Sequence, residues 1–242
     1  MMLEIQGVTK RFGGLLALDR VSLKIAEGQV FGLIGPNGAG KSTLFNVVSH
    51  LTACDQGQIE FRGARIGRLG PHEICLKGIG RTFQLVKPFG NISVLKNVII
   101  GAFCRTKDPE KAEQEAVEVL KFLDLHAKKD MLGKNLTIAD RKRLELAKAL
   151  ATKPRLLLLD EIMGGLNPKE IEDVIGLVKK IRDSGITIFI IEHVMQAIMR
   201  LCERVAVLNY GKKIAEGSPE EIGKNQEVIK AYLGEEYVVG RN

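Results

Sequence analysis

The beginning of the chain alternates between apolar and polar side chains over short segments. Residues 3–8 alternate weakly and residues 21–25 alternate strictly, which predicts two half-buried strands. Residues 58–61 form another short strand pattern between turns. Residues 30–34 are mostly apolar instead and lead into a glycine-rich turn. We therefore expect antiparallel strands beside the first strand of an α/β core.

The middle of the chain changes to helical spacing. Residues 88–152 are mostly helical by pattern, most clearly over residues 113–123 and 141–151. The second of these segments ends before Pro154, which cannot continue a helix. We expect a helical insertion of about residues 88–153.

The α/β pattern returns after this insertion. Residues 156–159 and 186–191 are apolar runs, as in parallel strands that are covered on both faces. Between them, residues 168–183 read as a helix that Pro168 opens and a Ser-Gly pair ends. Alternating apolar strands and helices predict a mostly parallel sheet.

The last part of the chain predicts a hairpin and short helices. Residues 204–209 and 212–216 flank Tyr210-Gly211 as two strands flank a tight turn. A helical tail of about residues 219–242 follows. The fold class is therefore α/β, with a mostly parallel sheet, an N-terminal antiparallel β subdomain and an inserted helical subdomain. We expect a single domain over residues 1–242.

The composition fits a globular chain. Of its 242 residues, 45% are apolar and 27% charged, and the net charge is +7. The charges are interspersed, so we interpret them as a solvated surface and expect no nucleic-acid partner. The four cysteines are scattered without a CxxC pair, which suits a reducing compartment. No signal peptide is expected, and no apolar run approaches the roughly 20 residues of a membrane-spanning helix.

A complete phosphate-binding motif follows the strand at residues 30–34. It matches G-x-x-x-x-G-K-[ST] and comprises Gly35, Pro36, Asn37, Gly38, Ala39, Gly40, Lys41, Ser42 and Thr43. Its N–H groups can surround phosphates at the positive end of the next helix. Lys41 would reach the β- and γ-phosphates, and Ser42 would hold Mg²⁺. The alternative, an ordinary glycine-rich turn, does not explain the strand–loop–helix context. The motif predicts that the α/β core is a P-loop NTPase core that binds a nucleoside triphosphate.

Two carboxylates end the apolar strand at residues 156–159. Asp160 would orient Mg²⁺, and Glu161 would polarise the water that attacks the γ-phosphate. Taken alone, the pair would serve equally well as a helix N-cap. The phosphate loop elsewhere in the chain favours the catalytic interpretation.

Three further side chains have weaker signals of their own. His193 follows the strand at residues 186–191 and would hold the attacking water, although a solvated histidine is the simpler interpretation. Gln84 would contact Mg²⁺ or that water, whereas loop amides more often only bond the backbone. Phe12 lies in a turn and would stack on adenine, or simply pack half-buried.

These features together resemble the ATP-binding-cassette family of ATPases, over nearly the whole chain. The resemblance assigns Phe12 to adenine, Gln84 to the Q-loop and His193 to the switch position. It places a signature segment at Leu136, Thr137, Ile138, Ala139 and Asp140, and a D-loop at residues 165–168. It implies that two cassettes pack head to tail around two ATP molecules, each held by one phosphate loop and the other signature.

Two segments narrow the resemblance to the ATPase subunits of branched-chain amino acid importers, the LivG type. They are residues 78–84 and residues 232–237. Such subunits lie on the cytoplasmic face of the membrane, beneath two permeases that an extracytoplasmic solute-binding protein supplies. The permease is expected to dock near residues 84–94. Related cassettes for urea or lipopolysaccharide share much of the pattern.

The chain departs from the family pattern in the signature, which normally reads Leu-Ser-Gly-Gly-Gln. Thr137 keeps a hydroxyl that can donate to a phosphate, but Ile138 replaces glycine and would be strained at a positive φ. Asp140 brings a negative charge, which a base such as Arg141 would have to compensate. Ile162 also replaces the proline that usually follows Glu161.

These departures leave two hypotheses open. They are tolerated variations in a fully active ATPase, or they mark a slow ATPase that works beside a better cassette in an asymmetric dimer. Other function classes are a soluble cassette protein, a weakly hydrolysing regulator and a small-molecule kinase. A single phosphate loop and the absence of sustained heptads disfavour the soluble class.

Overall fold

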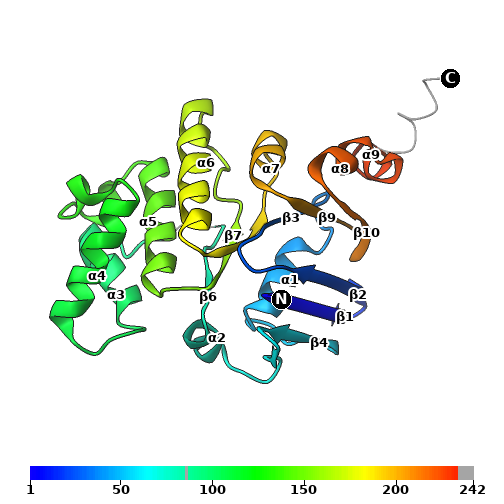
Figure 1. The fold of residues 1–242 in the computed structure, drawn as a ribbon, viewed down its shortest axis with the longest axis horizontal. Coiled ribbons are helices and arrows are strands. Elements are labelled where there is room, and N and C mark those ends of the chain that lie inside the picture. The colour runs from blue at the N-terminus through cyan, green and yellow to red at the C-terminus, as the bar shows by residue number, and fades with distance from the viewer. Residues whose placement is uncertain (85–86, 234–242) are drawn as a thin grey trace. The chain divides into compact units, whose positions relative to one another are not determined.

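The structure is a computed structural model that describes residues 1–84 and 87–233, and it divides into two compact units (Figure 1). The first unit comprises residues 1–71 and the chain from Thr187 onward, and the second comprises residues 72–186. Two residues of the expected permease-docking segment, 85 and 86, lie outside the described residues, as do residues 234–242 of the expected tail.

The first unit contains an antiparallel sheet with the strand order β2-β1-β4-β5. Its strands are β1 (Leu3–Phe12), β2 (Leu15–Ile25), β4 (Gln56–Phe61) and β5 (Ala64–Arg65). In β2, buried and exposed residues alternate from Val21 to Ile25 as the sequence predicts, because one face of the sheet packs on the core. The predicted N-terminal antiparallel β subdomain is confirmed.

A second set of strands in this unit is mostly parallel. Strand β3 (Val30–Ile34) lies parallel to β8 (Thr187–Ile191) on one side and to β9 (Arg204–Asn209) on the other. Leu33 pairs with Ile191 and with Ala206. Strand β10 (Lys212–Gly217) turns back antiparallel to β9 as the predicted hairpin. Strands β3 and β8 are buried along their whole length, which explains why their sequences do not alternate.

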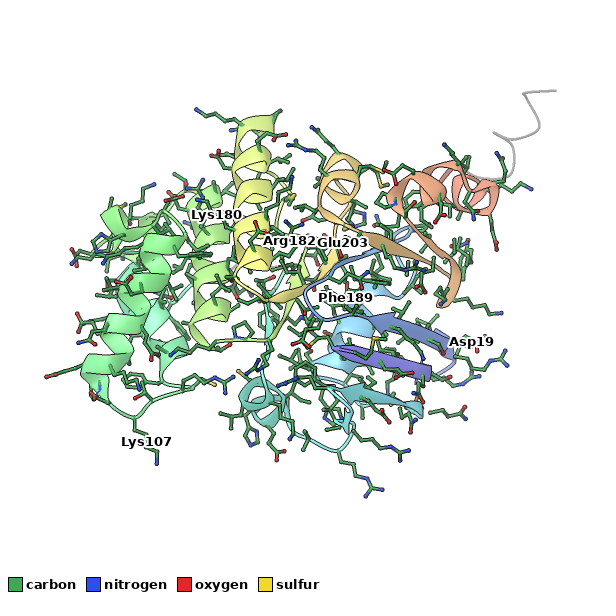
Figure 2. The ribbon with its side chains drawn as sticks, viewed as in Figure 1. Asp19, Lys107, Lys180, Arg182, Phe189 and Glu203 are labelled. Carbon is green, nitrogen blue, oxygen red and sulfur yellow. The ribbon has the colours of Figure 1, made fainter. Side chains whose placement is uncertain are left out.

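Helices pack against these strands. They are α1 (Lys41–Val48), α7 (Met195–Leu201), α8 (Pro219–Lys224) and α9 (Gln226–Leu233). The ring of Phe189 on β8 lies 5.7 Å from that of Phe31 and 4.8 Å from that of Phe45 on α1. Burying each such ring contributes roughly 2–3 kcal/mol, so this cluster fixes the helix that follows the phosphate loop. Figure 2 shows Phe189 inside this unit, whereas Asp19 points outward.

The second unit is predominantly helical. Its elements are α2 (Pro71–Lys77), β6 (Ile79–Arg81), α3 (Val94–Ala102), α4 (Pro109–Phe122), α5 (Ile138–Ala151), β7 (Leu156–Asp160) and α6 (Pro168–Asp183). Two 3₁₀ turns, His126–Lys128 and Gly133–Asn135, precede α5. Helix α3 packs against α4 and α5, as expected for the helical insertion. Strands β6 and β7 run parallel, and β7 is buried throughout.

Within residues 1–84 and 87–233, no helix combines the length and the apolar character that crossing a bilayer requires.

Candidate functional site

The phosphate loop connects β3 to α1 in the first unit, as the motif predicts. Lys41 opens the helix, yet it is only 6% exposed. Its Nζ donates hydrogen bonds to the carbonyl oxygens of Gly35, at 2.7 Å, and Pro36, at 3.0 Å. The ammonium group is thereby held over its own loop, where phosphate oxygens would be stronger acceptors than these carbonyls. Ser42, the next residue, is exposed.

Two glycines give the loop a shape that other residues would not allow. Gly35 has φ +151°, and a Cβ there would lie 2.1 Å from the carbonyl oxygen of Leu208. Gly40 has φ +102°, and a Cβ there would lie 2.5 Å from the carbonyl oxygen of Ala17. The loop can pack so closely on β2 and β9 only because both positions lack side chains.

The β9–β10 hairpin holds the loop from a second direction. The N–H of Gly211 donates to the carbonyl oxygen of Ala39 at 3.0 Å, and the N–H of Asp19 donates to the carbonyl oxygen of Gly211 at 2.9 Å. On α9, burial raises the pKa of Tyr232, and a hydrogen bond from the Gly35 backbone opposes that rise. Elements close to the C-terminus therefore contact the phosphate loop directly.

Phe12 and His193 are the other candidates in the first unit. Phe12 is the last residue of β1 rather than part of a turn, and it is about half exposed. The Nζ of Lys10 lies 5.3 Å from its ring centre, which gives one face a cationic neighbour. His193 is exposed and follows β8 directly after the buried Glu192. Both side chains are accessible to a ligand.

In the second unit, Asp160 at the end of β7 is 3% exposed and forms a buried ion pair. The Nη2 of Arg81, at the end of β6, donates to its carboxylate at 3.0 Å. The hydroxyl of Thr82 accepts a hydrogen bond from the Asp160 N–H at 3.1 Å. Sequence reasoning missed Arg81, because no periodicity indicates which cation meets a carboxylate on a neighbouring strand.

Glu161 is held at both its side chain and its backbone. Its carboxylate accepts a hydrogen bond from the Nε2 of Gln84, which unites two predicted catalytic residues. Its carbonyl oxygen accepts a hydrogen bond from the Nζ of Lys142 on α5 at 2.9 Å. Glu161 has φ +49°, in the left-handed region that few non-glycine residues adopt. The next residue, Ile162, is buried and anchors the turn.

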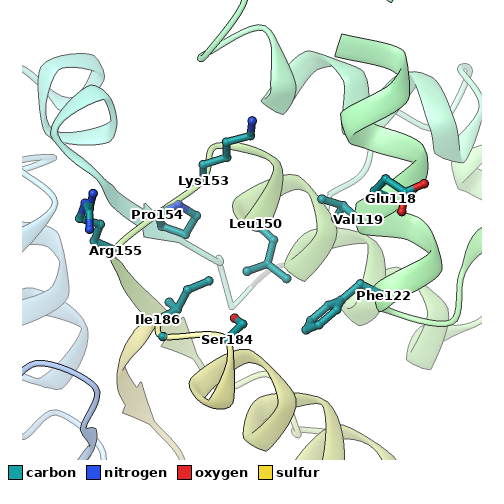
Figure 3. A pocket seen from close by; sticks show the side chains of 10 residues that line it. Glu118, Val119, Phe122, Leu150, Lys153, Pro154, Arg155, Ser184 and Ile186 are labelled. Atoms are coloured by element: carbon teal, nitrogen blue, oxygen red, sulfur yellow. The ribbon is translucent and has the colours of Figure 1, made fainter. Parts of the chain in front are cut away.

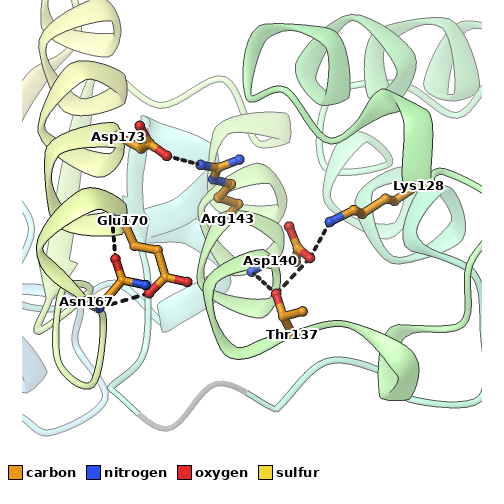
Figure 4. Close-up of polar contacts among 7 residues, drawn as sticks. All are labelled: Lys128, Thr137, Asp140, Arg143, Asn167, Glu170 and Asp173. Atoms are coloured by element: carbon orange, nitrogen blue, oxygen red, sulfur yellow. Dashed lines mark hydrogen bonds and ion pairs between the residues drawn. The ribbon is translucent and has the colours of Figure 1, made fainter.

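The signature segment begins helix α5. Thr137 is the N-cap, and its hydroxyl accepts from the N–H of Asp140 at 3.2 Å. That hydroxyl also donates to the Asp140 carboxylate at 2.8 Å, so its proton is engaged within the segment rather than pointing to a phosphate (Figure 4). Ile138 is the first helical residue and does not have a positive φ, so the backbone strain considered for it does not arise. Its side chain is 62% exposed.

Lys128, not Arg141, compensates the charge of Asp140. The Nζ of Lys128 donates to the Asp140 carboxylate at 2.5 Å (Figure 4). Arg141 donates instead to the carbonyl oxygen of Lys134. Burial favours the neutral carboxyl, but the hydrogen bonds from Lys128 and Thr137 outweigh it and hold the pKa of Asp140 below its usual range. Expecting Arg141 in this role was wrong, because on a helix adjacent residues point in different directions.

The D-loop ends in a capped helix. Asn167 caps α6 in a capping box with Glu170, and Pro168 occupies the first turn. One helix away, Arg143 on α5 donates to Asp173 on α6 at 3.2 Å (Figure 4). The signature helix is thus connected to α6 through Arg143 and to Glu161 through Lys142.

A cleft of about 530 Å³ also lies in the second unit, among Val119, Phe122, Leu150 and Ile186 (Figure 3). Among the residues that the structure describes, those that line it include none of the predicted site residues. Over the described ranges, no group of three or more His, Cys, Asp or Glu side chains is arranged to hold a metal ion by itself.

Comparison with known families identifies the class of protein. Residues 18–164 match the ABC transporter family, so the chain belongs to the ATP-binding cassettes and is an ATPase. Residues 212–238 match the family of branched-chain amino acid ATP-binding cassette transporters, which places the chain in that group. This second match does not favour the urea or lipopolysaccharide alternatives.

Individual relatives agree over nearly the whole chain. The high-affinity branched-chain amino acid transport ATP-binding protein BraF of Pseudomonas aeruginosa is 39% identical, with 97% of this chain and 98% of BraF covered. LivG of Salmonella typhimurium, from the same class of transport proteins, is 37% identical, with 97% of this chain and 98% of LivG covered.

Solved structures confirm the fold. A nucleotide-free cassette from an ABC transporter superposes with a TM-score of 0.89 at 31% identity, with 97% of this chain and 99% of that chain covered. A cassette dimer bound to ADP and phosphate superposes with a TM-score of 0.82 at 26% identity, with 90% and 99% covered. The predicted P-loop NTPase core is thus confirmed.

Proposed function

We propose that this chain is the ATP-hydrolysing subunit of an importer for branched-chain amino acids. The observation that carries the proposal is a complete phosphate loop with a buried Lys41, in a chain whose C-terminal segment matches the branched-chain transporter group. ATP is the substrate, and hydrolysis would drive transport through separate permease subunits that an extracytoplasmic binding protein supplies. The chain would act at the cytoplasmic face of the membrane.

The chemistry divides among the residues of both units. The loop N–H groups and Lys41 would hold the phosphates, and Phe12 would support the adenine. Glu161 would accept the proton of the attacking water, with Gln84 orienting its carboxylate. His193 would donate a hydrogen bond to the γ-phosphate. The hydrogen bond from Gln84 to the Glu161 carboxylate supports this division.

Mg²⁺ fits the donors that these residues offer. Ser42, Asp160 and Gln84 provide hydroxyl, carboxylate and amide oxygens, the ligand type that Mg²⁺ prefers, and we assign them to the ion. When bound, Mg²⁺ neutralises charge on the phosphates during transfer. The buried ion pair with Arg81 directs the Asp160 carboxylate.

Besides the permeases, the chain would have another cassette as a partner, as in the dimeric relative described above. Leu136, Thr137, Ile138, Ala139 and Asp140 would meet the nucleotide of that cassette. Because the Thr137 hydroxyl is engaged with Asp140, the N-terminal backbone of α5 would be the principal contact. This arrangement supports the asymmetric pair over the symmetric one, with the stronger signature supplied by a different chain.

The exposed apolar side chains of Phe89, Ile100 and Phe103 support a permease surface on and near α3. The domain organisation that we propose is one cassette with a helical insertion.

Reconstitution tests the proposal. Proteoliposomes that contain the permeases, the partner cassette and this chain should import radiolabelled leucine only with ATP inside. Glu161→Gln should bind nucleotide but abolish import, because it removes the base and keeps the shape. Import that continues with Glu161→Gln, or a chain that fails to bind Mg-ATP in calorimetry, would refute the proposal.

A further inference from the structure

Helix α5 contacts two functional regions of the second unit. Its first turn carries the signature residues Thr137 to Asp140. Lys142 follows two residues later and donates from Nζ to the carbonyl oxygen of Glu161 at 2.9 Å. The axial distance from Thr137 to Lys142 is about 7.5 Å in an α-helix, so both contacts lie within the same rigid segment.

The carbonyl that Lys142 holds belongs to a residue in an uncommon conformation. Glu161 has φ +49°, and an L-residue adopts this left-handed region only when its surroundings hold it there. A second hydrogen bond to this carbonyl comes from the N–H of Gly164 at 3.4 Å and is much longer. Lys142 therefore provides a short, charge-assisted contact that fixes the peptide after Glu161.

Glu161 is consequently connected to two different segments. Gln84 holds its carboxylate, and Lys142 holds its backbone. A shift of α5 would move Lys142 together with the signature turn, because both belong to the same helix. The direction of the Glu161 carboxylate would change with the backbone that carries it.

We propose that Lys142 is a positioning residue that couples the signature segment of this chain to its own catalytic glutamate. Engagement of the signature by the nucleotide of a second cassette would then set the backbone of Glu161 for hydrolysis at the phosphate loop of this chain. The inference rests on the proposed function, and it adds a route by which one nucleotide site governs the other.

Lys142→Met tests this role in the assembled cassette pair. The variant should lower kcat about tenfold or more, because a small displacement of a catalytic group has this effect. The affinity of the isolated chain for Mg-ATP should stay within about twofold, since none of the nucleotide-binding roles proposed above falls on Lys142. Lys142→Arg should recover most of the rate, because guanidinium can also donate to the carbonyl. Lys180→Met, an equal change at an exposed lysine on α6, is the matched control and should leave kcat unchanged.

A double variant distinguishes coupling from a local structural role. If Lys142 transmits engagement of the signature, Thr137→Ala and Lys142→Met should together lose no more rate than the worse single variant. The inference would be overturned if the rate loss of the double variant equalled the product of the two single losses. It would also be overturned if the cassette pair that carries Lys142→Met hydrolysed ATP at the parental rate. Failure of the parental chain to bind Mg-ATP would instead overturn the proposed function, so the two outcomes are distinguishable.

Discussion

The guanidinium of Arg81 and the carboxylate of Asp160 meet at 3.0 Å, at the ends of two neighbouring parallel strands, with both side chains buried. An ion pair in such a place stabilises the fold only while both partners are present. It also fixes the direction of a carboxylate inside the protein, which a fully apolar site would not.

Arg81→Met should therefore lower the free energy of unfolding by about 3–5 kcal/mol, since it removes the cation that faces a buried carboxylate. Urea denaturation followed by circular dichroism measures the loss. The double variant Arg81→Met/Asp160→Asn removes both charges and should recover most of it. If Arg81→Met were as stable as the parental chain, the ion pair would not contribute to the free energy of unfolding as predicted.

Gly40→Ala should destabilise the chain and weaken Mg-ATP binding. The added Cβ would lie 2.5 Å from the Ala17 carbonyl oxygen at a φ of +102°, so the loop must shift, at a cost of about 2 kcal/mol. Gly176→Ala is the matched control, because Gly176 lies inside α6 with nothing within 4 Å of a new Cβ. That change should stabilise the chain by roughly 0.5–1 kcal/mol. Equal effects at both positions would contradict the packing argument.

The stabilisation that Asp140 provides should depend on pH. Its pKa is lowered in the folded chain, so the contribution is complete above the unfolded value of about 4 and is lost as pH falls through the folded pKa. At pH 7, Asp140→Asn should cost about 1 kcal/mol, because the partner Lys128 is partly exposed. The difference between the parental chain and the variant should shrink as urea titrations are repeated below pH 4. If the stability difference between the parental chain and Asp140→Asn grew as the pH fell, the predicted direction of the pH dependence would be wrong.

Cys75 should behave as a protected thiol beside Cys104. Their Sγ atoms lie 3.6 Å apart, and burial raises the pKa of Cys75, with the neighbouring thiol adding to the rise. The thiolate needed for alkylation should form only above the ordinary cysteine pKa of about 8.5. Iodoacetamide labelling of Cys75, followed by mass spectrometry, should still be rising at pH 9. Labelling already complete at pH 7 would show that the thiol is accessible and unperturbed.

Lys87→Glu should weaken capture of the permease. Lys87 is exposed in the segment that we expect to dock there, and reversing a charge at an interface costs about tenfold in affinity. Pull-down from solubilised membranes, quantified against Lys180→Glu on α6, provides the measurement. Unchanged capture by Lys87→Glu would place the docking surface elsewhere.

Much of the fold can be predicted because the apolar patterns are local. Continuous apolar runs predict β3, β7 and β8, and the glycine-rich motif predicts the phosphate loop that follows β3. The helical spacing places the start of α5 at residue 141, three residues later than its actual start at Ile138. The reason is that the capping role of Thr137 depends on its hydrogen bond to the N–H of Asp140.

The contacts that tune the site cannot be predicted in this way. Lys128 meets Asp140 from 12 residues away, and Arg81 meets Asp160 from 79 residues away. Such pairs depend on tertiary packing, and one sequence contains many lysines and arginines that would serve equally well. The left-handed backbone of Glu161 has no sequence signal either, because glutamate has no preference for that conformation.

The turn at Gly211 supports the nucleotide loop through Ala39 and lies next to the segment that defines the branched-chain group. That terminal segment is therefore coupled in space to the residues that bind the nucleotide. A substitution that loosened the hairpin would first weaken binding of the nucleoside triphosphate, well before it unfolded the protein.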